Sequence, residues 1–271
     1  MPPMVSEADS DNWRLLDLSY DSVFLNLAFE EALARNTVSS NFRSTVRFWV
    51  NPPSVVLGRF QESSTELDAK LCEENNIQIA RRFTGGGAVF HDQGNLNFTI
   101  VTRRKERTAL SQLHEIDSSI VLEALGGLGL RATFLSPNSI LIGGRKVSGA
   151  AAAMGSDFTL WHSSILVSTN VDTLKLVLAP SEKAHSTRFV RSQWQPVTTL
   201  QAALGRTIGL DDVKEQLMRS VEESLGVRLE VDTPSTEEEN RVGRLYRRKY
   251  SLSEWNLYGN CKEIEFEEDI E

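Results

Sequence analysis

One short segment carries residues whose types and spacing could bind an anion. Arg81 and Arg82 end a β-type stretch and are followed by Gly85, Gly86 and Gly87. Glycine lets the backbone approach a ligand closely, so its N–H groups can face an anion, and a neighbouring guanidinium can pair with a phosphate or carboxylate. A plain glycine turn with surface arginines has the same residue types. The segment therefore predicts either a phosphate or acyl-phosphate site on a strand–loop–strand unit, or an ordinary hairpin.

Two familiar phosphate-binding loops do not fit this segment. A P-loop needs Lys-Ser or Lys-Thr after its last glycine, and a dinucleotide-binding loop needs glycines that open a helix. The residues that follow here, Ala88-Val89-Phe90-His91, are typical of a strand. The site would thus belong to a loop between two strands.

Lys146 is a second candidate for chemistry. It lies between the glycine turn Gly143-Gly144 and a predicted strand. A lone lysine is usually a solvated surface group, but beside an anion-binding loop it could supply a fixed positive charge where negative charge develops. Its neighbour Arg145 would point to the opposite face of the strand.

Composition narrows the class of protein. The chain has 271 residues, 40% of them hydrophobic, with a mean hydropathy of -0.26, which is typical of a globular protein. A net charge of -8 disfavours a non-specific nucleic-acid binder, and the apolar runs are too short for a membrane span. The cysteines and histidines lack metal-site spacing, so no fixed metal site is expected. The acidic start shows no signal or transit peptide, which predicts a cytoplasmic protein.

The elements that must position these residues alternate irregularly along the chain. Strand patterns cover residues 13–18, 46–50, 54–57, 77–81, 88–91, 96–101, 139–142, 146–151 and 159–167. Helical patterns follow a cap at Asp21 or Ser22, run from a capping box at Ser63 to Glu74, cover residues 108–125 and dominate from Val171. This order predicts an α/β (α+β) fold, a mixed sheet flanked by helices.

Five motifs resemble those of one family, the lipoate–protein ligases. Residues 81–98 are similar throughout to the family signature Arg-Arg-x-[Ser/Thr]-Gly-Gly-Gly-Ala-Val-[Phe/Tyr]-His-Asp-x-Gly-Asn-x-Asn-[Phe/Tyr]. Residues 144–149 resemble its lysine motif. The other three resemble its upstream strand (52–61), the loop that closes over the adenylate (189–198) and the end of the catalytic domain (249–256). The chain is therefore identified as a member of the lipoate–protein ligase A family, catalytic domain only.

The resemblance implies a fold and a reaction. The biotinyl/lipoyl protein ligase fold would span residues 13–262, between a flexible start at 1–12 and an acidic tail at 263–271, with no C-terminal accessory domain. Lipoate and ATP with Mg²⁺ would give lipoyl-adenylate, and the lipoyl group would pass to a lysine of a lipoyl carrier domain. That carrier would be of the 2-oxoacid dehydrogenase E2 or glycine cleavage H protein type, and a separate small accessory protein could be needed for activation.

The resemblance also assigns site residues. Lys146 would be catalytic, contacting first the carboxylate and then the acyl-phosphate oxygens. The adenylate and lipoate would be bound by Arg82, Gly85, Gly86, Gly87, Ala88, Val89, Phe90 and Asn138. Three further candidates are His91, His162 and Arg191, although the pattern around His162 favours a histidine packed in a strand over one that touches the substrate.

Two features keep other functions open. Ser139 stands where the family often has an aspartate, a residue suited to holding Mg²⁺. A lipoyl or octanoyl transferase of the same superfamily would work through a cysteine thioester, and a degenerate relative could bind a lipoyl domain without catalysis. No cysteine lies between Cys72 and Cys261, and Cys72 falls in a predicted helix. The sequence therefore favours the ligase over the transferase.

Overall fold

The computed structural model describes residues 12–39, 41–104, 109–178 and 190–260. Its first half consists of β1 (Asn12–Asp17), α1 (Val23–Arg35), η1 (Asn36–Val38), β2 (Thr45–Trp49), β3 (Ser54–Leu57), α2 (Ser63–Glu66), α3 (Ala69–Glu74), β4 (Gln78–Arg81), β5 (Val89–His91) and β6 (Asn95–Arg103). The sequence-based predictions for residues 1–11 and 263–271 lie outside the described residues.

The second half begins with a long helix and a run of antiparallel strands. It consists of α4 (Leu110–Gly127), β7 (Ala132–Leu135), β8 (Ser139–Ile142), β9 (Arg145–Met154), β10 (Phe158–Leu166), α5 (Val171–Val177), α6 (Leu200–Leu204), α7 (Leu210–Leu225), β11 (Arg228–Val231), α8 (Thr236–Leu245), the π-helical turn η2 (Tyr246–Tyr250) and α9 (Ser253–Tyr258). Within the described ranges, no helix is long and apolar enough to cross a membrane.

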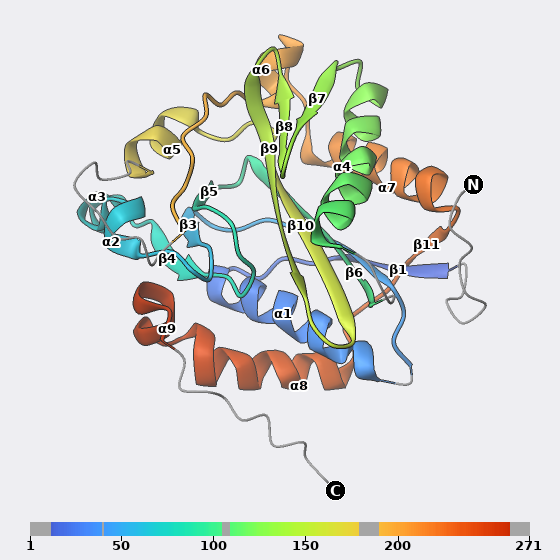
Figure 1. Ribbon diagram of the computed structural model, residues 1–271, viewed down its shortest axis with the longest axis horizontal. Helices are drawn as coiled ribbons and strands as arrows, with labels where there is room; N and C mark the ends of the chain where they lie inside the picture. Colours follow the sequence, from blue (N-terminus) through green and yellow to red (C-terminus); the bar gives the residue numbers. More distant parts are fainter. Residues whose placement is uncertain (1–11, 40, 105–108, 179–189, 261–271) are drawn as a thin grey trace, which may run out of the picture.

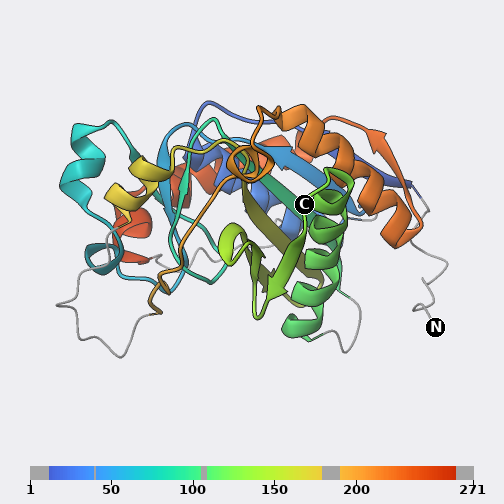
Figure 2. The same cartoon turned by 90° about the horizontal axis from the view of Figure 1, so that it is seen from above.

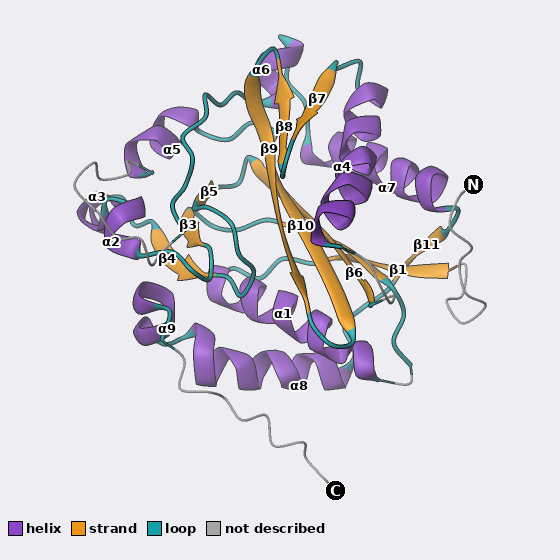
Figure 3. Ribbon diagram, viewed as in Figure 1, coloured by secondary structure: helices purple, strands orange, loops and turns teal. Residues whose placement is uncertain are grey.

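The strands form two mixed sheets. The larger has the order β11-β1-β2-β6-β10-β9-β8-β7, with parallel pairing among β11, β1 and β2 and antiparallel pairing from β2 onward. The smaller has the order β4-β3-β5, and Figure 3 shows its strands apart from the others. The predicted mixed sheet flanked by helices is confirmed, but its division was not predicted. Although β5 and β6 are neighbours in sequence, β5 pairs with β3 and so belongs to the smaller sheet.

Helices cover both faces of the larger sheet. Helix α1 lies against one face with α8 outside it, and α4 and α7 lie against the other (Figures 1 and 2). The core between α4, α7 and the sheet contains Phe48, Phe98, Trp161, Ile120 and Leu217. A second core lies around α1, and a third joins the small sheet to α3 and α5. The two sheets thus have separate apolar supports.

Helix α1 is buried on nearly all sides because it lies between the sheet and α8. The Ser22 hydroxyl caps it by accepting from the Leu25 N–H. Glu31 is buried, and its carboxylate accepts hydrogen bonds from the Lys249 ammonium (2.7 Å) and the Tyr250 hydroxyl (2.6 Å). This ion pair fastens η2, and with it the C-terminal helices, to α1.

One predicted helix and two unpredicted strands differ from the sequence-based expectation. The helix from Ser63 to Glu74 is interrupted after Glu66, and Asp68 caps the second piece by accepting from the Leu71 N–H (3.0 Å). The Glu66 carboxylate does not close a capping box but accepts from the Ser192 N–H (3.1 Å). Strands β7 and β11 escaped prediction because each is a short edge strand with mostly exposed or half-exposed residues.

Asp117 on α4 predicts an unusual dependence of stability on pH. It is buried, its Oδ2 has no hydrogen-bond partner among the described residues, and burial raises its pKa to about 8. Between the ordinary carboxyl pKa of 3.8 and about 8, the folded protein holds a proton that the unfolded chain has released. Stability therefore falls as pH rises through this window, by up to about 1.4 kcal/mol per pH unit.

We expect Asp117→Asn to remove this slope in urea-unfolding free energies measured between pH 5 and pH 8. Glu115→Gln, at an exposed position of the same helix, is the matched control and should keep the wild-type slope. A slope unchanged in Asp117→Asn would show that the carboxyl titrates at its ordinary pKa.

Candidate active site

The two arginines before the glycine loop bind different parts of the protein. Arg81 is fully buried, and its guanidinium donates to the carbonyls of Gly58 (2.9 Å), Gln61 (2.6 Å), Trp255 (2.9 Å) and Leu257 (3.0 Å). It therefore joins α9 to the small sheet and lines neither of the two cavities described below.

Arg82 holds the glycine loop. Its guanidinium donates to the carbonyls of Val56 (3.1 Å), Gly85 (2.6 Å) and Gly87 (2.8 Å), and its Nε also donates to the Thr84 hydroxyl (3.0 Å). All these acceptors are neutral. Burial, and then the charge of Arg81, lower the Arg82 pKa to about 10, so the side chain stays charged at neutral pH. The loop thus encloses a buried positive charge.

Gly86 has a conformation that the loop needs. Its φ of +88° lies in the region that residues with a side chain rarely adopt. A Cβ at this position would also lie 2.9 Å from an Arg82 guanidinium nitrogen. The loop can therefore close around Arg82 only because Gly86 has no side chain.

A cavity of about 490 Å³ lies beside this loop. Of the twelve residues predicted from the sequence, ten line it: Arg82, Gly86, Gly87, Ala88, Val89, His91, Asn138, Lys146, His162 and Arg191. Its lining includes the cationic side chains of Arg82, Lys146 and Arg191, two histidines, and no carboxylate among the described residues. The remaining two lie close by, since Gly85 holds Arg82 through its carbonyl and Phe90 lines the adjoining cavity.

The adjoining cavity is smaller and mostly apolar. It measures about 130 Å³, and its lining includes Phe90, Leu166, Leu174, Leu178 and Trp194. Both cavities are lined by Ala88, Val89, Lys146, Gly149, Ser164, Ser192, Gln193 and Gln195. They are therefore two lobes of one cleft that meet at Lys146.

Lys146 is held at this junction by its backbone. Its N–H donates to the Pro196 carbonyl (2.8 Å), and its own carbonyl accepts from the Thr198 N–H (3.0 Å). Within the described residues, no hydrogen bond or ion pair engages its ammonium. Burial, and then the charge of Arg82, lower the Lys146 pKa. The buried Arg82 and the half-buried Lys146 thus share one cleft wall, an arrangement that an anionic ligand would stabilise.

A chain of hydrogen bonds connects the loop to helix α1. The Thr84 hydroxyl, which accepts from Arg82, lies 2.9 Å from His162 Nε2, and His162 Nδ1 lies 3.1 Å from the Glu30 carboxylate. An ionised carboxylate accepts only, so Nδ1 carries the proton, and Nε2 then accepts from Thr84. The donors therefore point in one direction from Arg82 to Glu30.

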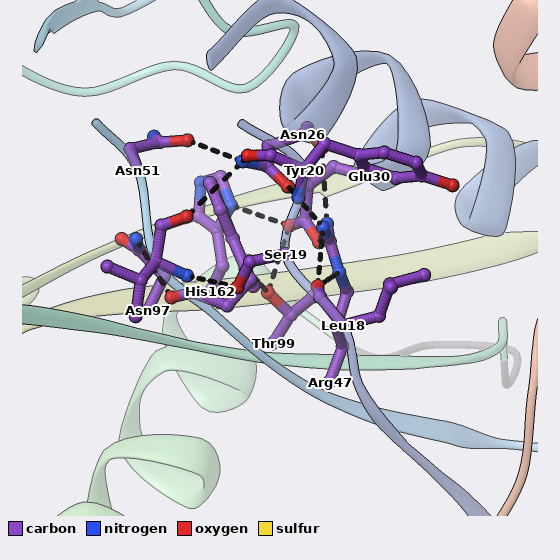
Figure 4. Close-up of polar contacts among 12 residues, drawn as sticks. Leu18, Ser19, Tyr20, Asn26, Glu30, Arg47, Asn51, Asn97, Thr99 and His162 are labelled. Atoms are coloured by element: carbon purple, nitrogen blue, oxygen red, sulfur yellow. Dashed lines mark hydrogen bonds and ion pairs between the residues drawn. The ribbon is translucent and has the colours of Figure 1, made fainter. Parts of the chain in front are cut away.

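Glu30 ends this chain as a buried carboxylate. It also accepts from Arg47 (2.9 Å) and the Thr99 hydroxyl (2.9 Å), and Figure 4 shows these side chains around His162. Burial acts to raise the Glu30 pKa, but the His162 hydrogen bond and the Arg47 charge lower it below its usual value. Burial lowers the His162 pKa despite Glu30, so the imidazole is neutral at pH 7. His162 is therefore both packed in the strand and part of the cleft wall.

His91 presents an N–H that has no partner among the described residues. Its Nδ1 lies 2.9 Å from Asn51 Nδ2, while Asn51 Oδ1 accepts from Asn26 Nδ2 (2.9 Å; Figure 4). The Asn51 amide must therefore donate to Nδ1, so the proton of His91 is on the buried, unpartnered Nε2. Burial, then the charge of Arg82, lower the His91 pKa to about 3. His91 is thus a neutral hydrogen-bond donor lining the larger cavity.

The segment that carries Arg191 lies against the glycine loop. The Ser192 hydroxyl accepts from the Ala88 N–H (2.9 Å) and from the Gln61 amide (3.0 Å), and the Ser192 N–H donates to Glu66. One loop N–H that could face an anion is thus engaged by a serine. Sequence analysis missed Glu66, which falls in the predicted capping box.

Two other predictions can be placed. Asn138 Nδ2 donates to the Ala150 carbonyl (2.6 Å), and the Ser139 hydroxyl donates to Gln195 Oε1 (3.2 Å). Trp49, which lines the larger cavity, was missed because one tryptophan in a buried strand gives no sequence signal for a site. Among the described residues, no group of three His, Cys, Asp or Glu side chains could hold a metal ion.

Sequence comparisons match the chain to a known family. Residues 22–222 match the family model described as the lipoyl protein ligase A/B catalytic domain. Lipoate-protein ligase A subunit 1 of Thermoplasma acidophilum is 32% identical over 250 residues, which cover 89% of this chain and 94% of that protein. An octanoyltransferase of Geobacillus kaustophilus is 27% identical, with 90% of this chain and 98% of that protein covered.

Solved structures share the fold. A chain from the archaeal lipoylation system of T. acidophilum, a bi-partite lipoate protein ligase and its E2 lipoyl domain, has a TM-score of 0.83 and 33% identity, covering 93% of this chain and 99% of that chain. A T. acidophilum protein with bound lipoic acid gives 0.79 and 31%, covering 91% and 99%. A lipoate-protein ligase A bound with ATP gives 0.81 and 31%, covering 91% and 98%.

The chain of hydrogen bonds below the loop predicts an effect of Thr84 on stability. Thr84→Val keeps the side-chain shape but leaves His162 Nε2 without its buried donor. We expect the free energy of unfolding in urea to fall by about 1–3 kcal/mol. Thr133→Val, at an exposed position of β7, is the control and should change it by less than about 0.5 kcal/mol. Equal effects of the two substitutions would contradict the proposed hydrogen-bond chain.

Proposed function

The chain belongs to the lipoyl protein ligase A/B catalytic domain family, and from this premise we propose that it is a lipoate–protein ligase. It would activate lipoate with MgATP and transfer the lipoyl group to a lysine of a lipoyl carrier domain. The observation that carries this proposal is the positive charge of the larger cavity, where Arg82 and Lys146 lie together and no carboxylate of the described residues lines the wall. Such a surface favours the binding of a carboxylate and a phosphate side by side.

The two lobes suit the two parts of an acyl adenylate. The larger is lined partly by Leu27, Trp49, Val56 and Ala151, which can enclose a hydrocarbon tail. The smaller, apolar lobe can receive a flat base against Phe90. Related structures contain lipoic acid in one case and ATP in another. We therefore place the mixed anhydride where the lobes meet, beside Lys146.

In the first step, the lipoate carboxylate attacks the α-phosphorus of ATP, and pyrophosphate leaves. Negative charge grows on the phosphoryl oxygens, where the Lys146 ammonium and the loop N–H groups can stabilise it. Arg82 adds positive charge from behind the loop, although most of its hydrogen bonds are engaged by loop carbonyls. Its main part is to hold the loop in shape.

In the second step, a neutral lysine amine of the carrier attacks the acyl carbon, and AMP leaves. The acyl oxygen becomes negative, and the same ammonium can stabilise it. One fixed cation can thus serve both steps because the phosphoryl and acyl oxygens are neighbours in the anhydride.

Mg²⁺ would arrive with ATP. The described residues offer no group of three ligands for it, and Asn138 and Ser139, which line the larger lobe together with Lys146, offer only neutral oxygens. Hard oxygen ligands from the phosphates can supply the charge that these residues lack. Because Ser139 carries no negative charge, the phosphates of the nucleotide would be the main ligands of Mg²⁺.

A separate accessory protein is part of the proposal. The relative that aligns over 94% of its length is named as subunit 1 of a ligase, and a related structure comes from a bi-partite ligase and its E2 lipoyl domain. We propose a similar arrangement here, with an E2 or glycine cleavage H protein type of carrier. Pyrophosphate release with lipoate and MgATP, measured with and without the accessory protein, tests the adenylation.

The transferase alternative is favoured by the likeness to an octanoyltransferase, but the thiol of Cys72 does not suit it. Cys72 is fully buried in the core of the small sheet. Burial, then the charge of Asp68, raise its pKa to about 11, so almost no thiolate is present at pH 7. Cys261 lies outside the described residues.

Lys146 gives the sharpest test of the ligase mechanism. Lys146→Ala should slow both adenylation and transfer by about 10²–10³-fold in single-turnover kinetics, the cost of losing one preorganised donor to an oxyanion. Lys146→Arg should also be slow, because a planar guanidinium does not replace a compact ammonium. The melting temperature should not fall, because the ammonium makes no ion pair with the described residues. Near wild-type rates of both steps in Lys146→Ala would exclude this mechanism.

A cysteine test separates the ligase from the transferase. The double variant Cys72→Ser, Cys261→Ser should keep its acyl-transfer rate, because neither step of the ligase uses a thiol. Complete loss of transfer with a normal melting curve, together with a thioester adduct in the mass spectrum of the wild type, would support the transferase.

A further inference from the structure

Strand β9 departs from regular pairing next to Lys146. Ile140 pairs with Ser148 and Leu141 with Lys146, so Val147 is the extra residue of a β-bulge. In a regular strand, residues three apart point to opposite faces. A bulge reverses this alternation and redirects a side chain. Lys146 is thereby brought to the same face as Gly149, while Val147 is buried in the core.

Gly149 leaves the space that the end of Lys146 occupies. A Cβ at this position would lie 2.7 Å from Lys146 Cε and 2.8 Å from Nζ, closer than real Cβ contacts. The ammonium therefore lies directly over the glycine. Any side chain at position 149 would displace it.

The backbone around Lys146 cannot easily make room. Its N–H and carbonyl are hydrogen-bonded to Pro196 and Thr198, and the bulge fixes its register against β8. A methyl group at position 149 would therefore move the lysine side chain rather than the strand. Because both residues line both lobes of the cleft, the displacement would occur at their junction.

We infer that Gly149 is a positioning residue for the reaction, because the missing side chain lets the Lys146 ammonium lie against β9 where the two lobes of the cleft meet. Its effect on rate rests on the proposed function, but the placement of the ammonium does not. Among the described residues, the charged groups that line the cleft around Lys146 are Arg82 and Arg191 in the larger lobe and Glu66 and Lys175 in the smaller.

The first test follows the ammonium without any ligase activity. The reactivity of Lys146 toward acetic anhydride is measured against pH by mass spectrometry. Burial and the charge of Arg82 lower the Lys146 pKa in the wild type. Gly149→Ala should raise it toward the ordinary value of 10.5, because the ammonium is pushed away from the cleft wall. Gly126→Ala, where a Cβ meets nothing within 4 Å, should leave it unchanged. An unchanged pKa in Gly149→Ala would overturn the inference.

The second test asks whether Gly149 acts through Lys146. Gly149→Ala should slow single-turnover adenylation by about 10- to 100-fold, as expected when a catalytic group is displaced by about 1 Å. In a Lys146→Ala background, the same change should have no further effect on rate or on affinity for an acyl-sulfamoyl adenosine. Equal losses in both backgrounds would mean that the methyl group obstructs the ligand itself, and would overturn the inference.

Separate controls distinguish an effect of Gly149→Ala on folding from an effect on function. Gly149→Ala should fold, because the clash is with the end of a flexible side chain. If it unfolds more easily in urea, the double variant with Lys146→Ala should regain stability, and an equally unstable double variant would contradict the inference. If the wild type releases no pyrophosphate even with an accessory protein, the ligase proposal fails, while the labelling result still decides the role of Gly149.

Discussion

The burial of two adjacent guanidinium groups is the constraint on which this structure depends. Arg81 and Arg82 remain charged at neutral pH, because even their lowered pKa values are about 10. Among the described residues, neither is paired with a carboxylate, so backbone carbonyls must satisfy them. Since a strand directs consecutive side chains to opposite faces, the Arg81 guanidinium donates to carbonyls of the C-terminal helix α9, and the Arg82 guanidinium donates to carbonyls of the glycine loop. Both the closure of the fold and the shape of the site follow from this single dipeptide.

The loop is also connected to the core by polar groups. Hydrogen bonds through Thr84 and His162 link Arg82 to Glu30 on α1, and the Arg47 guanidinium donates to the Glu30 carboxylate. A buried network of this kind is stable only when each member finds a partner, and it then resists deformation. The glycine loop is thus stiff despite its composition, as a preorganised oxyanion site requires.

The same fold hosts two chemistries among its relatives, because ligases and an octanoyltransferase both match the chain. Fold alone therefore does not choose between an adenylate and a thioester. The local site distinguishes the two chemistries by the charges that line the cleft and by the position of the Cys72 thiol. Here Arg82 and Lys146 lie in the larger lobe, which no carboxylate of the described residues lines, and Cys72 lies in an apolar core where its thiol stays protonated.

The sequence by itself determined the strand–loop–strand unit, the place of Lys146 between a glycine turn and a strand, and the mixed α/β class, because these follow from local backbone chemistry and side-chain periodicity. Only the tertiary structure decided that Arg82 serves the loop carbonyls, that Glu66 reaches Ser192 instead of closing a capping box, and that the strands divide into two sheets. The physical reason is that hydrogen-bond donors and acceptors choose partners by distance in space. Glu66 finds its partner at Ser192, and Arg82 finds one of its acceptors at Val56, on segments that no local pattern relates to them.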